Sequence, residues 1–252
     1  MSAKAQCSRP IVVPAAPTGF NVITEGALVR GVFPDWLRDL GKRIGCNFEF
    51  PVVPRARADA MVLESKGGDV LIPAAQTAER DRRALFVHLR DSVVTLVVHA
   101  SKHGPIPADI NALKQSDWRA ALVRRYSFGN AYNTLVSELE MASRIYSVND
   151  LDTIARMLRA GRLDFTLLPA TLMYASLLDG KPLDSAAEFR YADIAGLPHN
   201  QGGAYLSTTS LSEKDFELLR SAMATSARDG SLRRAFNAYY PPEVVRHERF
   251  LK

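Results

Sequence analysis

The sequence is poor in the residues that usually build a catalytic or metal-binding centre. It has two cysteines, two tryptophans and five scattered histidines in 252 residues. His99 and His103 share a Gly/Pro-rich loop rather than one face of a helix, which is not the spacing of a metal-ligand pair. The Gly-x-Ser-x-Gly turn, the Gly-Lys-Ser/Thr phosphate loop and the Cys-x-x-Cys pair are also missing. These absences argue against the common hydrolase, nucleotide-binding and redox classes, and they predict neither a metal nor a cofactor.

Long apolar runs and blocks of one charge are missing as well. Apolar residues make up 47% of the chain, which is typical of a globular protein. No apolar run approaches the roughly 20 residues that a membrane-spanning helix needs. Lys and Arg number 32 against 27 Asp and Glu, a net charge of +5, but the two signs are mixed along the chain. The mild basicity therefore does not predict a nucleic-acid partner.

Alternating strand and helix patterns run through the chain, whose length fits one large or two small domains. The clearest helix covers 31–44, with one apolar stripe, a proline near its start and a glycine after its end. Other helices are expected at 131–144, 151–160 and 212–228, and two more end at Lys66 and Leu178. Strands are expected at 11–13, 47–53, 69–72, 93–98, 121–125, 145–147, 163–168, 189–195 and 204–208. This alternation predicts an α/β fold with parallel strands and helical crossovers.

The stretch 67–86, GGDVLIPAAQTAERDRRALF, carries the strongest functional signal. A glycine pair ends a helix, and a short buried strand follows and stops at Pro73. Thr77 then opens a new turn that contains Arg80. Arg80 thus follows the carboxyl end of a strand, where open α/β sheets bind ligands, and its guanidinium suits a carboxylate or phosphate. The alternative is that Arg80 is one of three solvated surface arginines in this run.

The order of these features resembles the type II periplasmic solute-binding proteins of the polar amino-acid kind. The resemblance rests on a helix, Gly, Asp, a buried strand, Thr-x-x-Arg and Leu-Phe-Val, and it extends over most of the chain. It implies a two-lobed α/β fold, each lobe a mainly parallel sheet flanked by helices. Two hinge crossings, near His99–Pro107 and Pro198–Gly203, would join lobe 1 (1–98 and 203–252) to lobe 2 (99–202).

The resemblance also implies a ligand site that both lobes share. In the family the Thr-x-x-Arg arginine, here Arg80, grips the carboxylate of the ligand, and a helix-opening turn of the second lobe forms the other jaw. The expected ligand-binding residues are Phe20, Arg55, Gln76, Thr77, Arg80, Ser127, Phe128, Gly129 and Asn130. Three of them also have an ordinary structural alternative: Phe20 as a core plug, Arg55 as a loop arginine and Asn130 as a helix cap.

Departures from the family pattern bear on the ligand. Amino-acid binders carry hydroxyls before the arginine, where this chain has Pro-Ala-Ala at 73–75. They also place an acid after a Gly-Arg-x-Asp strand to pair the ligand's ammonium group, but here Pro169 and its neighbours follow Gly161–Asp164. Arg55 stands where the family has a stacking aromatic, and it adds a positive charge. The expected solute is therefore a small carboxylate or another anion rather than an α-amino acid.

The two cysteines lie near neighbouring strands of such a sheet. Cys7 precedes the first expected strand and Cys46 opens the second, so we expect a disulfide with Cα atoms about 5.5–6 Å apart. The alternative is a pair of unrelated buried thiols. A disulfide is typical of an oxidising compartment, and Ala3-Lys4-Ala5 has the form of a cleavage site left by a removed export signal. Both features favour the periplasm.

Capture of a solute is the function that these features favour. The chain is interpreted as a monomeric binding protein, not an enzyme, that closes on a small anionic solute by hinge bending and delivers it to an ABC permease. A second hypothesis is a secreted dehydratase on the same scaffold, which needs an acid or base aimed into the cleft. A third is a sensor domain or the effector-binding domain of a regulator.

Overall fold

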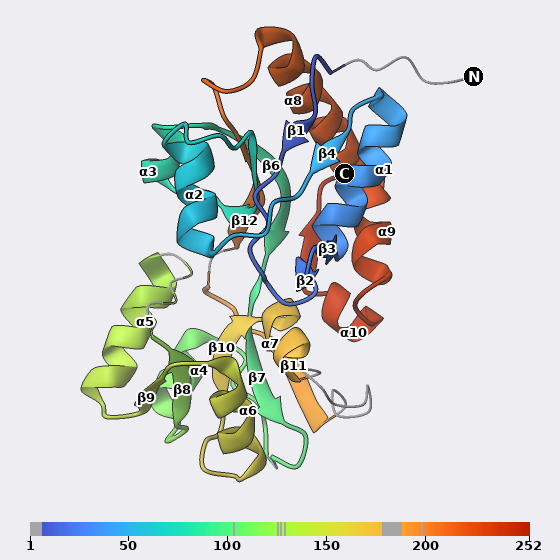
Figure 1. Cartoon of the computed structure of the whole chain (residues 1–252). Coiled ribbons are helices and arrows are strands. Elements are labelled where there is room, and N and C mark those ends of the chain that lie inside the picture. Colours follow the sequence, from blue (N-terminus) through green and yellow to red (C-terminus); the bar gives the residue numbers. More distant parts are fainter. Residues whose placement is uncertain are drawn as a thin grey trace. The chain divides into compact units, whose positions relative to one another are not determined.

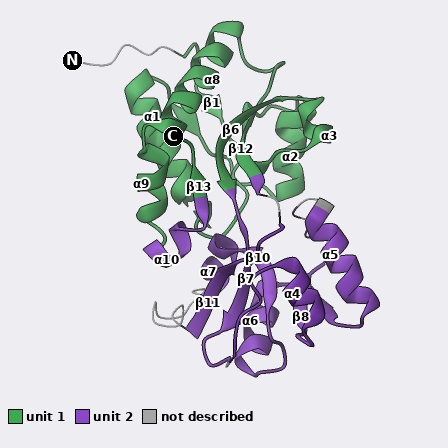
Figure 2. Cartoon of the chain, turned by 180° about the vertical axis from the view of Figure 1, so that it is seen from behind, with its two compact units in different colours: residues 1–91, 201–241, 249–252 green, residues 92–200, 242–248 purple. Residues whose placement is uncertain are grey.

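The structure, a computed structural model, describes residues 7–102, 104–124, 126, 128, 130–177, 188–197 and 199–252. The chain forms two units, shown in different colours in Figure 2. Unit 1 comprises residues up to 91, 201–241 and 249–252, and unit 2 comprises 92–200 and 242–248. The chain crosses between the units at 91/92, 200/201, 241/242 and 248/249, so residues 242–248 belong to unit 2 rather than to the expected lobe 1. The first crossing lies before the expected 98/99. The reason is that strand β7 (Val94–His99) pairs on both edges with strands of unit 2.

Unit 1 is built around a four-stranded sheet with the order β13-β6-β12-β5. Unit 1 as a whole contains the strands β1 (Ile11–Val12), β2 (Ile23–Glu25), β3 (Leu28–Arg30), β4 (Phe48–Glu49), β5 (Val70–Ala75), β6 (Leu85–Ser92), β12 (Asn200–Leu206) and β13 (Glu248–Phe250). Its helices are α1 (Val32–Ile44), α2 (Arg55–Leu63), α3 (Ala78–Asp81), α8 (Glu213–Arg228) and α9 (Ser231–Asn237). Figure 1 shows α1, α8 and α9, which contact one another, on one side of this sheet and α2 and α3 on the other.

Unit 2 repeats the strand–helix alternation. Its strands are β7, β8 (Ala120–Val123), β9 (Ile145–Val148), β10 (Thr166–Pro169) and β11 (Phe189–Asp193), and its helices are α4 (Ile110–Gln115), α5 (Asn130–Met141), α6 (Leu151–Arg159), α7 (Ala170–Leu177) and α10 (Pro242–Val245). Strands β8 and β9 are parallel, whereas β7 pairs antiparallel with both β10 and β11. The core joins these strands to α5 through Leu96, Tyr132, Leu135 and Phe165, all at most 2% exposed.

The helix ends follow local sequence signals. Thr77, Asp150 and Ser212 each cap a helix by accepting a hydrogen bond from the third residue after them. Gly45 ends α1 in the left-handed conformation that glycine adopts without strain. These are the ends that the sequence predicts. The sequence also predicts a last short helix that ends at Pro241-Pro242, but Pro242 instead starts the short helix α10, and helix α4 has no counterpart among the expected helices.

Strand β5 is longer than the sequence predicts. The expected strand ended at Pro73, but β5 continues to Ala75. It pairs antiparallel with β12, and the register of that pairing shifts between Gly203 and Tyr205. The irregularity lies beside Pro73, which has no N–H to donate to the ladder, so the strand continues past the proline. Gly203 has no room for a side chain, because a Cβ atom there would lie 2.0 Å from the Val87 carbonyl oxygen.

The disulfide is confirmed. Cys7 and Cys46 are bonded, with Cα atoms 5.1 Å apart, and the bond closes a loop with a sequence separation of 39. It links the segment before β1 to the turn after α1. The two strands that follow, β1 and β4, pair in parallel as expected, with Ile11 opposite Phe48. Among the described residues, no helix is long and apolar enough to cross a membrane.

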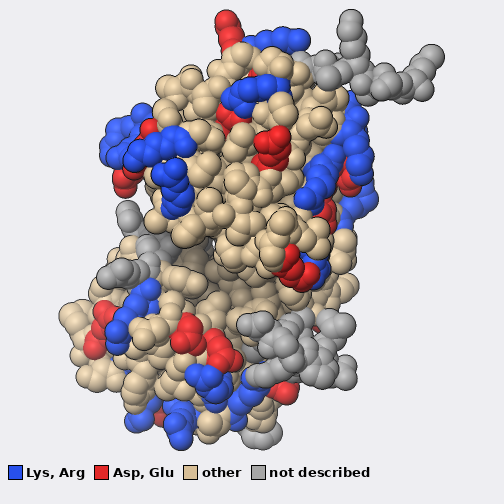
Figure 3. All heavy atoms as spheres, viewed as in Figure 1, with Lys and Arg blue, Asp and Glu red and all other residues tan. Residues whose placement is uncertain are grey.

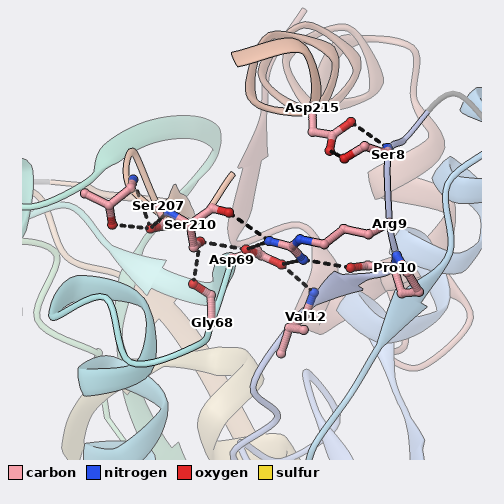
Figure 4. Close-up of polar contacts among 10 residues, drawn as sticks. Ser8, Arg9, Pro10, Val12, Gly68, Asp69, Ser207, Ser210 and Asp215 are labelled. Carbon is pink, nitrogen blue, oxygen red and sulfur yellow. Dashed lines mark hydrogen bonds and ion pairs between the residues drawn. The ribbon is translucent and has the colours of Figure 1, made fainter. Parts of the chain in front are cut away.

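A buried carboxylate joins three distant segments of unit 1 at the start of β5. Asp69, 1% exposed, accepts hydrogen bonds from both Arg9 Nη atoms at 2.7 and 2.8 Å, from the Val12 N–H at 2.8 Å and from Ser210 Oγ at 2.6 Å (Figure 4). Burial alone would raise the pKa of Asp69, but these hydrogen bonds outweigh it and hold the pKa below its ordinary value. The ionised form of Asp69 is therefore part of the folded state.

We predict that replacing both cysteines by serine lowers the free energy of unfolding. Without the bond, the unfolded chain regains the entropy of a loop of this length, which corresponds to about 4 kcal/mol. Denaturant unfolding of the oxidised protein and the Cys7→Ser/Cys46→Ser variant measures the difference. Reduction of the wild-type protein is expected to lower its stability to that of the variant. Equal stability of oxidised and reduced protein would contradict this.

We predict that Asp69→Asn destabilises the fold in a pH-dependent way. At pH 7 the loss of charged hydrogen bonds is expected to cost about 2–3 kcal/mol. Because the folded-state pKa of Asp69 is lowered, its contribution is fully present above the unfolded pKa of about 4 and is lost as pH falls through the folded value. The gap in unfolding free energy between the wild type and Asp69→Asn, measured with urea, should therefore be smaller at pH 3 than at pH 7. Asp39→Asn, on an exposed side chain of α1, is the matched control, and a gap that is constant with pH would disprove the prediction.

Candidate ligand-binding site

The loop between β5 and α3 is held by a tyrosine from β12. The Tyr205 hydroxyl accepts a hydrogen bond from the Thr77 N–H at 3.0 Å and donates to Asp81 Oδ1 at 2.7 Å. Asp81 Oδ2 accepts a bond from Gln76 Nε2 at 3.0 Å, and Thr77 Oγ1 accepts one from the Arg80 N–H at 3.3 Å. Burial is the main reason that the pKa of Tyr205 rises to about 12, so the hydroxyl keeps its proton at neutral pH. These contacts fix the backbone that carries Arg80.

Two arginines of unit 1 share one carboxylate. Asp59 Oδ2 lies 2.9 Å from Arg80 Nη2, and Asp59 Oδ1 lies 2.9 Å from Arg55 Nε. Each arginine also donates to the main chain of β5, Arg80 to the Ala75 carbonyl at 3.1 Å and Arg55 to the Pro73 carbonyl at 2.9 Å. The side chains of Arg55, Asp59 and Arg80 are 40%, 27% and 22% exposed, so a solute can reach the cluster from solvent.

The cluster keeps a positive charge. Burial lowers the pKa of Arg55, the Asp59 carboxylate opposes that shift, and the neighbouring Arg80 charge adds to it. An arginine pKa starts so high that the Arg55 guanidinium keeps its charge at neutral pH despite this shift. Two guanidinium groups and one carboxylate leave a net charge of +1. On the α2 and α3 side of unit 1, Figure 3 shows basic side chains with acidic ones among them rather than a surface of one sign.

The structure brings together four of the expected unit 1 residues, Arg55, Gln76, Thr77 and Arg80, at the carboxyl end of β5. Phe20, in contrast, is half-buried, and its ring lies 5.6 Å from the ring of Tyr240. That contact fits its alternative role as a core plug. Contact of any of these side chains with a ligand stays a prediction.

The expected residues of the second lobe belong to unit 2. Phe128 makes edge-to-face contacts with Tyr126 and Tyr132, at centroid distances of 6.0 and 5.1 Å, and packs against the core of unit 2. Asn130 is the first residue of α5. Ser127 and Gly129 lie outside the described residues. The role of this turn in binding therefore stays a prediction too.

The position where the family has an acid is filled by the end of a strand. Pro169 closes β10 and stands opposite Val94 of β7. The acid of the Gly-Arg-x-Asp segment, Asp164, pairs with Lys102 and accepts a hydrogen bond from the Arg119 N–H at 2.7 Å. No group of three or more metal-ligating side chains gathers within the described part of the chain.

Asp59 and Tyr205 are the site residues that sequence reasoning missed. A helical signal for Asp59 existed, because Arg55 and Asp59 are separated by four residues and share one face of α2. Its contact with Arg80 had no local signal, since that contact depends on how α2 packs beside β5. Tyr205 gave none either, because its hydroxyl reaches Thr77 only through the pairing of β12 with β5.

Solved structures share this architecture. The probable amino-acid ABC transporter extracellular-binding protein of Bacillus subtilis superimposes with a TM-score of 0.72 at 16% identity, over 95% of this chain and 100% of the other. The second substrate-binding domain of Lactococcus lactis GlnP gives 0.71 at 13% identity, over 95% and 98%. This chain therefore has the two-lobed α/β fold of type II periplasmic binding proteins, as the sequence resemblance implies.

Two further neighbours have other roles. A histidine kinase sensor domain with similarity to periplasmic binding proteins gives a TM-score of 0.62 at 13% identity, over 94% of this chain and 97% of the other. An ancestral amino-acid-binding protein, described as a precursor of cyclohexadienyl dehydratase, gives 0.64 at 14% identity, over 92% and 95%. No protein-family model matches the sequence, and no curated protein matches it either. At these identities the likeness establishes the fold alone.

We predict that Tyr205→Phe loosens the loop that carries Arg80. The variant keeps the ring, which packs at 5.0 Å from Phe86, but leaves the Thr77 N–H and Asp81 without their shared partner. The expected loss of unfolding free energy is about 1–3 kcal/mol. Denaturant unfolding measures it, with Tyr146→Phe as the control because Tyr146 is 45% exposed. Equal losses in the two variants would show that the Tyr205 hydroxyl does not hold the loop.

Proposed function

We propose that this protein is an extracytoplasmic solute-binding protein that captures a small anionic solute by binding the solute's carboxylate group and delivers it to an ABC permease. The observation that carries the proposal is the cluster of Arg55, Asp59 and Arg80 at the carboxyl end of β5. An arginine fork held by main-chain and side-chain contacts is a preorganised partner for a carboxylate. The shared fold supports a transport role, since the Bacillus subtilis neighbour is described as a probable amino-acid ABC transporter binding protein and the GlnP neighbour as a substrate-binding domain.

The charge balance favours an anion over an α-amino acid. Asp59 is engaged by two guanidinium groups, Asp81 by Tyr205 and Gln76, and Asp164 by Lys102 and a main-chain N–H. The family position of the ammonium partner holds Pro169. An ammonium group enclosed without a counter-charge costs several kcal/mol, which removes useful affinity. A carboxylate without an α-amino group avoids that cost.

In this proposal the solute is enclosed by hinge bending between two lobes, and the turn that opens α5 supplies the second jaw. Free N–H groups at a helix start attract anions, which suits the same class of solute. The protein acts as a monomer, and the disulfide suits the oxidising periplasm. No catalytic step is assigned to it.

Two other functions have support among the neighbours. The precursor of cyclohexadienyl dehydratase favours a secreted dehydratase, and the histidine kinase domain favours a sensor. A dehydratase requires an acid or base placed at the substrate. Mass spectrometry of a carboxylate incubated with the protein distinguishes the two functions, because an enzyme converts the carboxylate and a binding protein leaves it unchanged.

We predict that small carboxylates raise the melting temperature more than the matching amino acids do. Three pairs differ only in the α-amino group: propionate and alanine, succinate and aspartate, glutarate and glutamate. Within each pair the acid without the amino group is expected to give the larger shift. A screen in which the amino acids are the better stabilisers would refute the anionic solute.

We predict that Arg80→Ala abolishes binding of the best carboxylate in that screen, because it removes the fork that meets the ligand. Isothermal titration calorimetry measures the loss. Arg83→Ala is the matched control, since Arg83 is 45% exposed and pairs with Glu64 and Glu79 instead. Normal binding by Arg80→Ala, or an equal loss in Arg83→Ala, would overturn the assignment of Arg80.

A further inference from the structure

Asp59 occupies the groups that a ligand carboxylate would use. Its Oδ2 atom lies 2.9 Å from the Arg80 guanidinium, and its Oδ1 atom lies 2.9 Å from Arg55 Nε. Oδ1 is shielded from solvent, and none of the described residues donates a hydrogen bond to it in good geometry. The carboxylate is thus held by a hydrogen bond from Arg80 to Oδ2 and, at Oδ1, by the charge of Arg55. Arg55 can therefore turn part of its fork toward a second anion without breaking an ideal hydrogen bond to Oδ1.

The placement of Asp59 sets the charge that a solute meets. Without it, Arg55 and Arg80 would present two positive charges to the solute. With it, they present a net charge of one. A solute with one carboxylate then balances the charge of the cluster. A solute with two carboxylates leaves an excess negative charge close to Asp59, and the two like charges repel each other.

We infer that Asp59 is a specificity-determining residue that tunes the site to solutes with a single negative charge. The inference rests on the proposed function, because it concerns the same anion site. The helix α2 that carries Asp59 also carries Arg55, four residues earlier, so the counter-charge is built into the same helical face. Asp59 contacts the groups that bind the solute and selects among solutes by repulsion.

A matched pair of four-carbon acids, butyrate and succinate, tests the inference. Isothermal titration calorimetry gives their affinities for the wild-type protein, for Asp59→Asn and for Asp59→Ala. In both variants the ratio of succinate to butyrate affinity is expected to rise at least tenfold. Asp39→Asn is the control, since it makes the same change of net charge on an exposed side chain of α1 that pairs with Lys42. Its ratio is expected to equal that of the wild type.

The outcomes separate the inference from the proposed function. A ratio that stays the same in proteins that still bind both acids overturns the role of Asp59 and leaves the anion site intact. A rise of equal size in Asp39→Asn also overturns it, because net charge alone would then explain the effect. If circular dichroism shows that both Asp59 variants fail to fold, Asp59 serves to stabilise the fold, and this outcome overturns the inference too. Failure of the wild type and all variants to bind either acid overturns the proposed function and the inference together.

Discussion

Unit 1 depends on the buried carboxylate of Asp69. Through it the segment before β1, the start of β5 and the loop after β12 are joined, although their residues lie far apart in the sequence. The main chain adds to the same junction, because the Asp69 N–H donates to the Val12 carbonyl and the Asp69 carbonyl accepts from the Ser207 N–H. Strand β5 is thus held at its first residues, and its far end leads directly to Thr77 and Arg80.

The proposed site is held in place by strand β5. Main-chain carbonyls at the end of β5 accept hydrogen bonds from Arg55 and Arg80, and Tyr205 of the neighbouring strand β12 holds the loop between β5 and α3. Binding groups that are fixed before the solute arrives lose little entropy on binding. In the proposed site Asp59 offsets one of the two guanidinium charges, which would leave a single positive charge for the solute.

Local signals in the sequence predict much of this structure, and long-range contacts account for the differences. Capping residues and the stripe of α1 define helix ends because their hydrogen bonds close within one turn. The Thr-x-x-Arg turn is local for the same reason. The continuation of β5 past Pro73 depends instead on an irregular pairing with β12, and the place where the units meet depends on the partners of β7. The contact of Asp59 with Arg80 was missed because an ion pair between two elements leaves no pattern in either one, and the spacing of Asp59 from Arg55 was its only local signal.

Native mass spectrometry of the freshly purified protein can show whether Arg80 captures a carboxylate, because a tightly held solute survives purification. We expect a non-covalent adduct on the wild-type protein that is released on denaturation and identified as a carboxylic acid without an α-amino group. The same preparation of Arg80→Ala is predicted to carry none. An adduct that proves to be an α-amino acid would rule out the anionic solute, and one that Arg80→Ala retains in full would rule out capture through Arg80.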